Sequence, residues 1–417
     1  MRLLIFSQYF WPETFGINSL ARALAERGQK LSVLTGKPNY PEGRIFEGYT
    51  FSGIQRENHD GIEVVRVPLI PRGNRSSLRL ALNYLSFILS GYILAPFALR
   101  GRRFDIVFVY APSPLLQALP AIFLAWLKRA PLVVWVQDLW PESLTATGFI
   151  HNRFVLKVVE VAVRYVYRHS DLILIQSEAF RTSVSKMTRD ARKIRYFPNS
   201  ADAIVFQHYM EGKESAPDGL VSAIRDNFSV VFTGNVGTAQ SVETIIEAAD
   251  RLRGHPNICF FVVGSGSRLD WLAAEVRLRN LNNVVLTGRL PVSAMPSILS
   301  AASVLLATLS DEPIFTYTIP SKVQTYLAAG RPIIVCMNGE GARVLSEARA
   351  GIACGAGDAV ALAEAVLQMQ RLTPQERTQL GENGRRYYAE HYESGKLIEQ
   401  LIGQLESLRM AQDRSAG

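Results

Sequence analysis

The sequence contains few of the residues that build metal centres and disulfide frameworks. Its three cysteines, Cys259, Cys336 and Cys354, lie far apart without a CxxC pair, and its six histidines form no HxH or HxxxH pair. These absences argue against a disulfide scaffold and against a zinc motif. We expect the thiols to be reduced and to pack as small hydrophobic side chains, and we expect no metal ion and no cofactor.

Several catalytic and targeting motifs are absent as well. The sequence has no Walker A lysine motif and no GxSxG elbow, which disfavours a P-loop nucleotidase and a serine hydrolase of that type. No signal peptide precedes the first predicted strand. Together with the unpaired cysteines, this predicts a cytoplasmic protein.

Acidic residues are scarce in the N-terminal half. Residues 1–200 hold 26 Lys and Arg against 14 Asp and Glu, a net charge of +12, whereas the rest of the chain is mildly acidic. A basic half predicts contact with an anionic surface. Charge alone does not separate nucleic acid from anionic lipid as that surface.

One long apolar run is present, over residues 78–99. Arg79, Asn83, Ser86 and Ser90 interrupt it, and arginines flank it on both sides. Three interpretations remain open: one or two buried helices, an apolar patch that docks on a bilayer, or a membrane span. An amphipathic basic helix predicted over residues 153–169 favours the docking patch.

Two series of apolar strands alternate with helical patterns. The first runs from "MRLLIFSQYF" through "LSVLTG" to "DLILIQS", and the second from "FSVVFTGNVG" through "ICFFVVGSG" to "PIIVCMN". This alternation predicts an α/β fold with two doubly wound parallel sheets. Residues 197–220 follow neither period, so we expect the linker between two domains there.

Three glycine-containing turns follow predicted strands and precede helices. Gly16 lies in the loop after the first strand, and "GNVG" at 234–237 and "GSG" at 264–266 follow strands of the second sheet. Ligands of parallel α/β sheets bind at the carboxyl ends of the strands, where glycines let backbone amides approach a phosphate. For Gly16, a glycine needed only for the turn is the alternative.

The stretch "PSKVQTYLAAGRP" places a lysine where an α-helix disfavours it. Pro320 ends the preceding segment, Ser321 is a good N-cap, and Lys322 falls in the first helical turn. Because a helix N-terminus is already positive, a cation there is unfavourable unless an anion lies between the ammonium and the amides. The pattern therefore predicts an anion site, with a solvated lysine as the alternative.

The stretch "VQDLWPES" ends an apolar strand in Gln137 and Asp138, and Trp140 follows. A carboxylate beside a tryptophan suits a sugar, because the hydroxyls need acceptors and the ring stacks on the indole. A helix N-cap is the alternative role for Asp138.

The stretches "YFWPETFGINSL", "VQDLWPES", "FTGNVG" and "PSKVQTYLAAGRP", in this order, resemble bacterial family 4 glycosyltransferases of the GT-B fold. The most similar subgroup builds O-antigen, capsule and colanic-acid-type polysaccharides and includes fucosamine-transferase-like members. The resemblance covers nearly the whole chain. It implies an acceptor-side Rossmann-like domain over residues 1–200, a nucleotide-sugar domain over 201–387, and a C-terminal helix at about 388–410 that packs back on the first domain.

The resemblance also implies an activity. Enzymes of this kind transfer a hexosyl or N-acetylhexosaminyl group from a nucleotide-diphosphate sugar, here expected to be a UDP-sugar, with retention and without a metal. We expect the acceptor to be a lipid-linked saccharide of the undecaprenyl-diphosphate type. The enzyme would then attach peripherally to the inner face of the cytoplasmic membrane, with no nucleic-acid partner.

Site residues are carried over by position. Lys322, which would hold the diphosphate, and Asp138 are the implied catalytic residues. The implied donor-binding residues are Gly16, Gly234, Asn235, Gly237, Gly264, Gly266, Gly288, Arg289, Leu290, Ser321, Lys322 and Thr325. Gln137, Asp138 and Trp140 are implied to contact the acceptor or the transferred sugar.

The chain departs from its relatives at the donor site. Many relatives bind the ribose through the second Glu of a Glu-x7-Glu pair, and the corresponding positions here are Tyr317 and Thr325. Asn235 and Gln240 stand where many relatives have Arg and Lys, so more of the diphosphate binding falls on Lys322 and on backbone amides.

Two other functions remain open. One is a UDP-sugar 2-epimerase of the same fold, which would need several carboxylates and a histidine around the sugar that the sequence does not place. The other is a sugar-binding subunit of a polysaccharide assembly complex whose activity has decayed, which the Thr325 departure keeps open.

Overall fold

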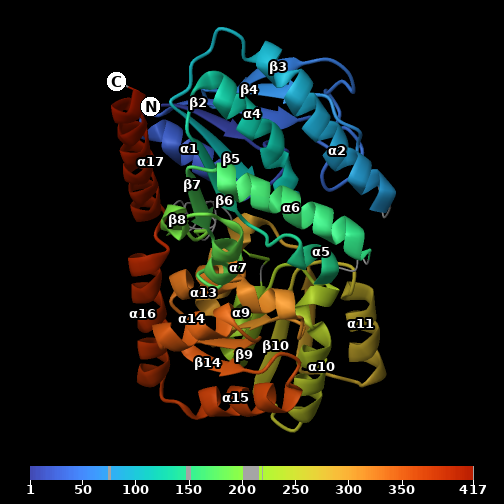
Figure 1. Ribbon diagram of the computed structural model, residues 1–417. Helices are drawn as coiled ribbons and strands as arrows, with labels where there is room; N and C mark the ends of the chain where they lie inside the picture. The colour runs from blue at the N-terminus through green and yellow to red at the C-terminus, as the bar shows by residue number, and fades with distance from the viewer. Residues whose placement is uncertain (74–76, 147–151, 201–215, 218, 417) are drawn as a thin grey trace. The chain divides into compact units, whose positions relative to one another are not determined.

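The computed structural model describes residues 1–73, 77–146, 152–200, 216–217 and 219–416, and it divides them into two compact units (Figure 1). Unit 1 comprises Met1–Pro198 together with Gly395–Gly417, and unit 2 comprises Asn199–Ser394. Most of the linker predicted over residues 197–220 lies outside the described residues. Each unit is an α/β layer structure, so the prediction of two Rossmann-like domains with parallel sheets is confirmed.

Unit 1 is built on a sheet with strand order β3-β4-β2-β1-β5-β6-β7-β8. Its strands are β1 (Arg2–Phe6), β2 (Lys30–Gly36), β3 (Gln55–His59), β4 (Ile62–Val67), β5 (Ile106–Ala111), β6 (Leu132–Val136), β7 (Leu172–Ile175) and β8 (Ile194–Tyr196). Its helices are α1 (Gly16–Glu26), α2 (Ser77–Ile93), α3 (Ala95–Ala98), α4 (Ala118–Lys128), α5 (Glu142–Ala146), α6 (Arg153–His169), α7 (Phe180–Met187) and α17 (Ser394–Ala416).

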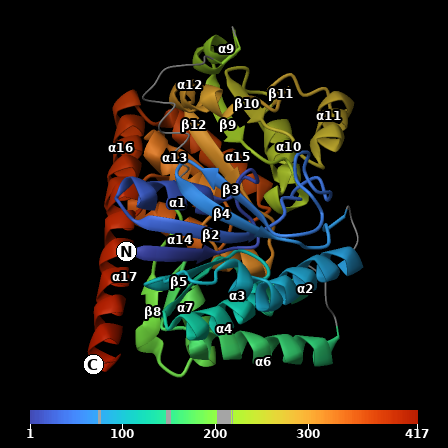
Figure 2. The same cartoon turned by 90° about the horizontal axis from the view of Figure 1, so that it is seen from above.

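Helices cover both faces of this sheet, as the apolar character of its central strands requires. Every residue of β5, β6 and β7 is buried, which is typical of parallel strands packed on two sides. The core on one face includes side chains of α2, α4, α6 and α7. The core on the other face includes side chains of α1 and α17 (Figure 2).

The edge strand β3 is the one antiparallel member of the sheet, pairing with β4 from Gln55 opposite Arg66 to His59 opposite Ile62. Asp60 and Gly61 join the two strands with positive φ angles of 50° and 79°, the conformation of a tight hairpin turn. The sequence does not predict β3, because its residues are all polar or charged and carry no apolar alternation.

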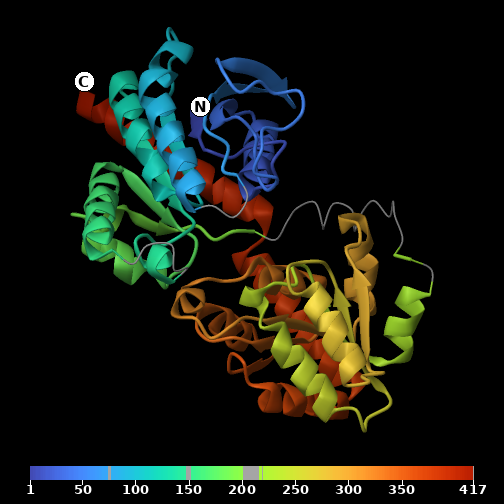
Figure 3. The same cartoon turned by 90° about the vertical axis from the view of Figure 1, so that its right-hand side faces the viewer.

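Unit 2 is built on a parallel sheet with strand order β11-β10-β9-β12-β13-β14. Its strands are β9 (Phe228–Thr233), β10 (Ile258–Val263), β11 (Val284–Gly288), β12 (Val304–Thr308), β13 (Ile333–Cys336) and β14 (Gly351–Cys354). Its helices are α9 (Leu220–Asp226), α10 (Val242–Arg251), α11 (Leu269–Leu278), α12 (Met295–Ala301), α13 (Ser321–Ala329), α14 (Glu340–Ala348), α15 (Ala359–Arg371) and α16 (Pro374–His391). They cover both faces of the sheet (Figure 3).

The C-terminal helix differs in its bounds from the prediction of one helix at about 388–410. α16 ends at His391 and α17 begins at Ser394, so two helices share that range. Leu397, Leu401 and Leu405 of α17 are buried in unit 1, on the sheet face that α1 also covers. The last helix of the chain thus completes the core of the first unit.

The apolar run over 78–99 forms α2 and the short helix α3. Among the described residues, no helix combines the length and the apolar character that crossing a membrane demands. The membrane-span interpretation is therefore wrong, and α2 lies instead against α4. Gly91 permits the close approach, since a Cβ atom there would come within 2.9 Å of the Pro120 ring.

Candidate functional site

A pocket of about 650 Å³ opens at the carboxyl ends of the unit 2 strands. The strand order places β9 between β10 and β12, so the residues that follow these three strands meet at one edge of the sheet. Of the implied donor-binding residues, those that line the pocket are Gly234, Asn235, Gly264, Arg289, Leu290, Ser321, Lys322 and Thr325. The tertiary structure thus brings four separate sequence motifs to one cavity.

Lys322 is a buried cation in this pocket. Its Nζ is buried, and no hydrogen-bond acceptor among the described residues reaches it. Nζ instead makes a cation–π contact with the ring of Phe232, whose centroid lies 3.6 Å away. Burial lowers the pKa of this amine from 10.5 to about 7, because its charged form has lost water without gaining an anion. The site therefore favours an anionic ligand beside Nζ.

The helix that carries Lys322 adds backbone donors. α13 begins at Ser321, and Pro320 occupies the N-cap position without a side-chain capping bond. The expectation that Ser321 caps this helix is therefore wrong, and Ser321 is its first helical residue. The first amides of a helix have no intrahelical acceptor, so Ser321 and Lys322 present both N–H donors and the positive end of the helix dipole to the pocket.

Tyr326 fixes α13 to the end of β9. Its fully buried hydroxyl accepts a hydrogen bond from the Thr233 amide at 3.0 Å and lies 3.1 Å from Thr233 Oγ1. Burial raises the pKa of Tyr326 to about 12, so the phenol stays protonated. The contact holds the lysine-bearing turn beside the glycine turn that follows β9.

Two glycines let the strand-end turns approach one another. Gly234 has φ of 108°, and a Cβ atom there would lie 3.0 Å from Lys322 Cε. A Cβ atom on Gly264 would lie 1.8 Å from the Gly234 carbonyl oxygen, which is incompatible with the packing. Gly234 therefore leaves room for the lysine, and Gly264 leaves room for Gly234.

The turn after β9 is cross-linked by Gln240. Its Oε1 accepts hydrogen bonds from Asn235 Nδ2 at 3.0 Å and from the Gly237 amide at 3.2 Å. Its carbonyl oxygen accepts from the hydroxyl of Thr308, at the end of β12. Gln240 thus holds the turn in place, a role that the sequence alone did not reveal.

An apolar wall closes one side of the pocket. It consists of Leu290, Val292, Met295 and Leu299, which follow β11 and enter α12, and the exposed Arg289 lies beside them. Of this wall, the sequence analysis had identified Leu290 alone. The signal for the others was weak, because apolar residues before and within a helix usually read as core.

Three predicted donor residues of unit 2 do not line the pocket. A Cβ atom on Gly237 would lie 2.7 Å from Asn235 Nδ2, and one on Gly266 would lie 2.3 Å from the Val236 carbonyl oxygen. Gly237 therefore leaves room for side chains of its own turn, and Gly266 serves close packing between the two strand-end turns. Gly288 has φ of 72° and nothing near its Cβ position, so its turn conformation accounts for the glycine.

Gly16 lies in unit 1, at the first residue of α1. Its φ is not in the left-handed region, and a Cβ atom there would meet only the Tyr110 hydroxyl oxygen, at 3.8 Å. The turn and the packing of unit 1 therefore do not require glycine at this position.

Asp138 follows β6 at the carboxyl edge of the unit 1 sheet. Burial raises its pKa to about 6, although Ser143, Trp140 and the Leu139 amide beside it favour the charged form. Trp140 lies 6.4 Å, ring centre to ring centre, from Tyr84. Asp138 is thus both part of the turn that enters α5 and a carboxylate whose pKa lies near neutrality.

Glu13, in the loop after β1, is a buried carboxylate that the sequence analysis missed. Its Oε1 accepts hydrogen bonds from the amides of Asn39 and Tyr40, both at 2.8 Å. Its Oε2 is buried, and no donor in the described part of the chain reaches it. Burial raises the pKa of Glu13 to about 7. Only the tertiary structure shows this, because "WPETFG" reads as an exposed turn.

No cluster of three or more metal-ligating side chains occurs within the described ranges. Cys259, Cys336 and Cys354 are buried. Cys336 and Cys354 are partners in the register of β13 and β14. None of the three lines the pocket.

Comparison with known proteins identifies the two units separately. Residues 15–200 match the glycosyl transferase 4-like domain family, and residues 227–371 match the glycosyl transferases group 1 family. The chain is 26% identical over 353 residues to the putative colanic acid biosynthesis glycosyl transferase WcaI of Escherichia coli, covering 80% of this chain and 83% of that protein.

Solved structures agree on the fold. The crystal structure of Anabaena Alr3699/HepE in complex with UDP superposes with a TM-score of 0.70 at 15% identity, covering 98% of this chain and 100% of the other. The α,α-trehalose 6-phosphate synthase of Burkholderia multivorans superposes with a TM-score of 0.75 at 13% identity, covering 100% of this chain and 98% of the other. The chain is a glycosyltransferase with a GT-B fold, carrying a glycosyl transferase 4-like domain and a group 1 domain.

Proposed function

We propose that this glycosyltransferase moves a hexosyl or N-acetylhexosaminyl group from a UDP-sugar to a lipid-linked saccharide in the synthesis of a cell-surface polysaccharide. The observation that carries the donor half of the proposal is the buried Lys322 ammonium, which has no acceptor in the described structure and lies at the N-terminus of α13. A nucleotide diphosphate supplies the missing anion. The amides of the first helical turn then donate to the same phosphates.

The proposed chemistry is retaining and independent of a metal ion. Departure of the sugar leaves negative charge on the diphosphate, and Lys322 with the α13 amides stabilises that charge as it develops. The acceptor hydroxyl attacks the anomeric carbon from the side of the leaving group, and the departing phosphate oxygen takes its proton. No side chain of the pocket needs to act as a nucleophile in this scheme.

The proposed base is uracil, which the apolar wall of Leu290, Val292, Met295 and Leu299 would contact beside Arg289. Support for UDP comes from the Anabaena protein of the same fold, crystallised in complex with UDP and in complex with UDP-glucose. Thr325, which also lines the pocket, takes the position from which many relatives bind the ribose with a carboxylate. The role of Gly16 beside the donor phosphates stays a prediction.

On the acceptor side, we propose that Gln137, Asp138 and Trp140 contact the acceptor saccharide or the transferred sugar. The similarity to WcaI, named for colanic acid biosynthesis, supports a role in polysaccharide synthesis. We further propose a lipid-linked acceptor of the undecaprenyl-diphosphate type and a place in the subgroup with fucosamine-transferase-like members. Such an acceptor requires peripheral attachment to the inner face of the cytoplasmic membrane.

The test combines a donor screen with an acceptor assay. The protein is heated with a panel of UDP-, GDP-, ADP- and TDP-sugars, and we expect UDP-sugars to raise its unfolding temperature most. UDP release is then followed with and without detergent-extracted lipid acceptor. Release that depends on the acceptor supports transfer. Interconversion of UDP-sugars without release would make the protein an epimerase, and donor binding without either reaction would make it a sugar-binding subunit.

A further inference from the structure

Helix α2 faces the body of unit 1 with Phe87, which is buried in the core, and with three polar side chains. Asn83 is buried, donates a hydrogen bond to the Ile70 carbonyl at 2.6 Å and accepts one from Gln8 Nε2 at 2.6 Å. Ser86 Oγ accepts from the Ile70 amide at 2.9 Å, and Ser90 Oγ donates to the Pro68 carbonyl at 2.6 Å. The polar residues that interrupt the apolar run therefore satisfy groups inside the unit.

The opposite side of α2 and of the following α3 is apolar and exposed to solvent. Its side chains recur at the three- and four-residue spacing of one helical stripe, and they are Leu78, Leu82, Leu85, Leu89, Ile93 and Phe97. Leu78 and Phe97, at the two ends, are 70% and 72% exposed. A helix on a water-facing surface normally shows the reverse pattern.

Helix α6 also carries an apolar stripe that is exposed to solvent. Phe154, Val158, Val161 and Tyr165 lie exposed along one stripe, whereas Val159, Val163 and Val166 on another stripe are buried in the core. The helix therefore has two apolar faces, and packing within unit 1 accounts for only one of them.

Aromatic contacts join α2 to α4, and α4 packs against α6. The ring centres of Tyr92 on α2 and Phe123 on α4 lie 6.0 Å apart, and Phe123 lies 6.0 Å from Trp126. Tyr165 of α6 is close enough to Tyr92 to contribute, after burial, to raising its pKa. Figure 2 shows the three helices next to one another on the same side of the unit 1 sheet. We call this surface the three-helix face.

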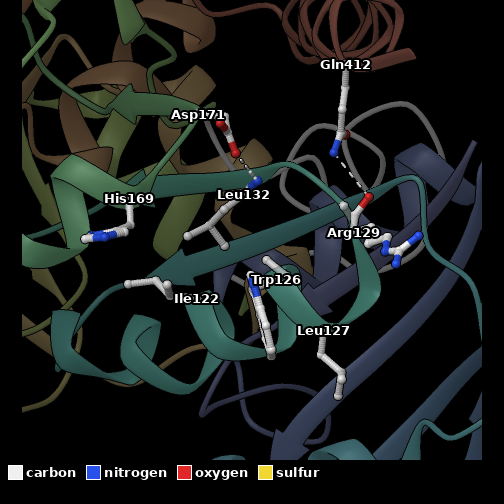
Figure 4. Close-up of a pocket in the computed structure, with 10 residues that line it drawn as sticks. Ile122, Trp126, Leu127, Arg129, Leu132, His169, Asp171 and Gln412 are labelled. Atoms are coloured by element: carbon white, nitrogen blue, oxygen red, sulfur yellow. Dashed lines mark hydrogen bonds between the residues drawn. The ribbon is translucent and has the colours of Figure 1, made fainter. Parts of the chain in front are cut away.

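A hollow of about 610 Å³ borders the three-helix face at the C-terminal end of α4 (Figure 4). Trp126, 73% exposed, and Leu127 project there, and Arg129 and His169 lie beside them. Gln412 of α17 donates to the Arg129 carbonyl at 3.1 Å and closes the far side. A tryptophan between apolar and basic groups is typical of a boundary between hydrocarbon and lipid headgroups.

The charges around the three-helix face are predominantly basic. Asp171, the one acidic residue among the described residues that line the hollow, accepts a hydrogen bond from the Leu132 amide at 2.8 Å. Exposed basic side chains flank it, namely Arg100, Arg103, Arg129, Arg153, Lys157 and Arg168. Between Glu63 and Asp138 the sequence has a single acidic residue, Asp105, which is paired with Arg2. On α6 the one acidic residue, Glu160, is paired with Arg164 at 2.7 Å.

We infer that the three-helix face docks on an anionic phospholipid bilayer, with α2 and α6 lying in the interfacial plane. Apolar side chains enter the headgroup and acyl boundary, and the flanking basic residues contact anionic headgroups. This deepens the proposed membrane attachment and rests on that part of the proposed function. It is independent of the donor pocket, because all of its residues belong to unit 1.

The experiment is vesicle flotation of the full-length protein without any sugar nucleotide. Vesicles of phosphatidylcholine alone are compared with vesicles that also contain phosphatidylglycerol. The apolar variant is Leu85→Glu with Leu89→Glu, and its matched control is Leu278→Glu, an exposed leucine of α11 in unit 2. The charge variant is Arg100→Gln with Lys157→Gln, and its control is Arg251→Gln in unit 2.

We expect the protein to float with phosphatidylglycerol vesicles. The apolar variant should lose at least about tenfold in partition coefficient. The charge variant should lose about fivefold for each charge removed at low salt. Both controls should bind as the unmodified protein does, and UDP protection against unfolding should stay equal in all variants.

Three results would overturn the inference. The first is equal binding by the apolar variant and its control, and the second is equal binding to vesicles with and without phosphatidylglycerol. The third is self-association of the protein in the absence of vesicles that the apolar variant abolishes, which would make the face an interface between two copies of the chain. Loss of UDP protection in every protein, with flotation intact, would contradict the donor proposal and leave the docking inference standing.

Discussion

At the scale of single residues, Lys322 connects local structure to ligand binding. A buried ammonium without an acceptor lowers the stability of the unliganded protein. A ligand that supplies an anion beside Nζ removes this cost. The same contact that would stabilise the bound diphosphate is thus a weakness of the unbound fold.

Lys322→Met should therefore change stability and binding in opposite directions. We expect its UDP affinity to fall by about 10- to 100-fold, corresponding to the loss of a charge-assisted hydrogen bond worth about 1.5–3 kcal/mol. The free energy of unfolding of the unliganded protein should rise, because a desolvated charge is removed. Calorimetric titration and urea denaturation at pH 6 measure the two effects. Lys186→Met, at an exposed lysine of α7, is the control and should alter neither.

The pH dependence of UDP binding follows from the lowered pKa. In the free protein the pKa of Lys322 is about 7, so the amine is largely neutral above that pH. Binding of a diphosphate favours the charged form and takes up a proton. The Kd for UDP should therefore rise with pH between 7 and 9, by at most about tenfold per pH unit. The slope should vanish in Lys322→Met, and an equal slope in that variant would remove Lys322 as its cause.

Two glycines that look alike in the sequence should respond differently to alanine. Gly264→Ala puts a Cβ atom 1.8 Å from the Gly234 carbonyl oxygen, and we expect a clear loss of unfolding temperature. Gly16→Ala meets only the Tyr110 hydroxyl at 3.8 Å, so its unfolding temperature should stay unchanged. If Gly16 faces the donor, turnover of Gly16→Ala should fall nonetheless. Unchanged turnover would mean that no ligand approaches this residue.

At the scale of elements, the donor pocket depends on how α13 is held against β9. The Tyr326 hydroxyl is a hydrogen-bonded contact between them, and it satisfies the buried amide of Thr233. A side chain buried in the core of unit 2 therefore positions α13.

Tyr326→Phe removes this contact without changing the packing volume much. The Thr233 amide would then be buried without a partner, which costs about 1–3 kcal/mol of unfolding free energy. We also expect weaker UDP binding, because the first turn of α13 is no longer fixed beside Gly234. Urea denaturation and calorimetric titration give the two values. Tyr317→Phe, at an exposed tyrosine, is the control. A variant as stable as the unmodified protein would contradict the structural role given to this hydroxyl.

At the scale of the whole molecule, the chain ends by completing the unit in which it began. α17 buries Leu397, Ile398, Leu401 and Leu405 in the core of unit 1. Unit 1 therefore cannot form its full core until the end of the chain is available.

Leu401→Ala should destabilise unit 1 by about 2–5 kcal/mol, the cost of a large-to-small change at a fully buried position. Hydrogen exchange measured by peptide should become faster in β5 and β6 and stay unchanged in β9 and β12. UDP should still protect unit 2. Met410→Ala, at a half-exposed position of the same helix, is the control. Faster exchange in β9 would show that the loss reaches the second unit.

The sequence by itself determined the layer architecture and pointed to the strand ends that border the unit 2 pocket. Apolar strands that alternate with helical patterns have few ways to bury both faces of a sheet, and residues after parallel strands meet at one edge. The misplaced charge of Lys322 at a helix N-terminus is a local conflict, and local conflicts are visible in the sequence. The turns at 234–237 and 264–266 were also predictable, because their glycines directly follow apolar strands in the sequence.

Only the tertiary structure decided which of these residues face the pocket and which pack the turns. Gly237 and Gly266 resemble Gly234 and Gly264 in sequence, but their roles depend on which atoms approach them. These are side chains of its own turn for Gly237 and the backbone of the neighbouring turn for Gly266. The burial of Glu13, the contact of Gln240 with Thr308 and the polar inner side of α2 likewise join residues distant in the chain. Periodicity showed that α2 is apolar, but only its packing showed that the apolar stripe points outward. Local patterns fix what a segment can form, and long-range packing fixes which of its sides remains free.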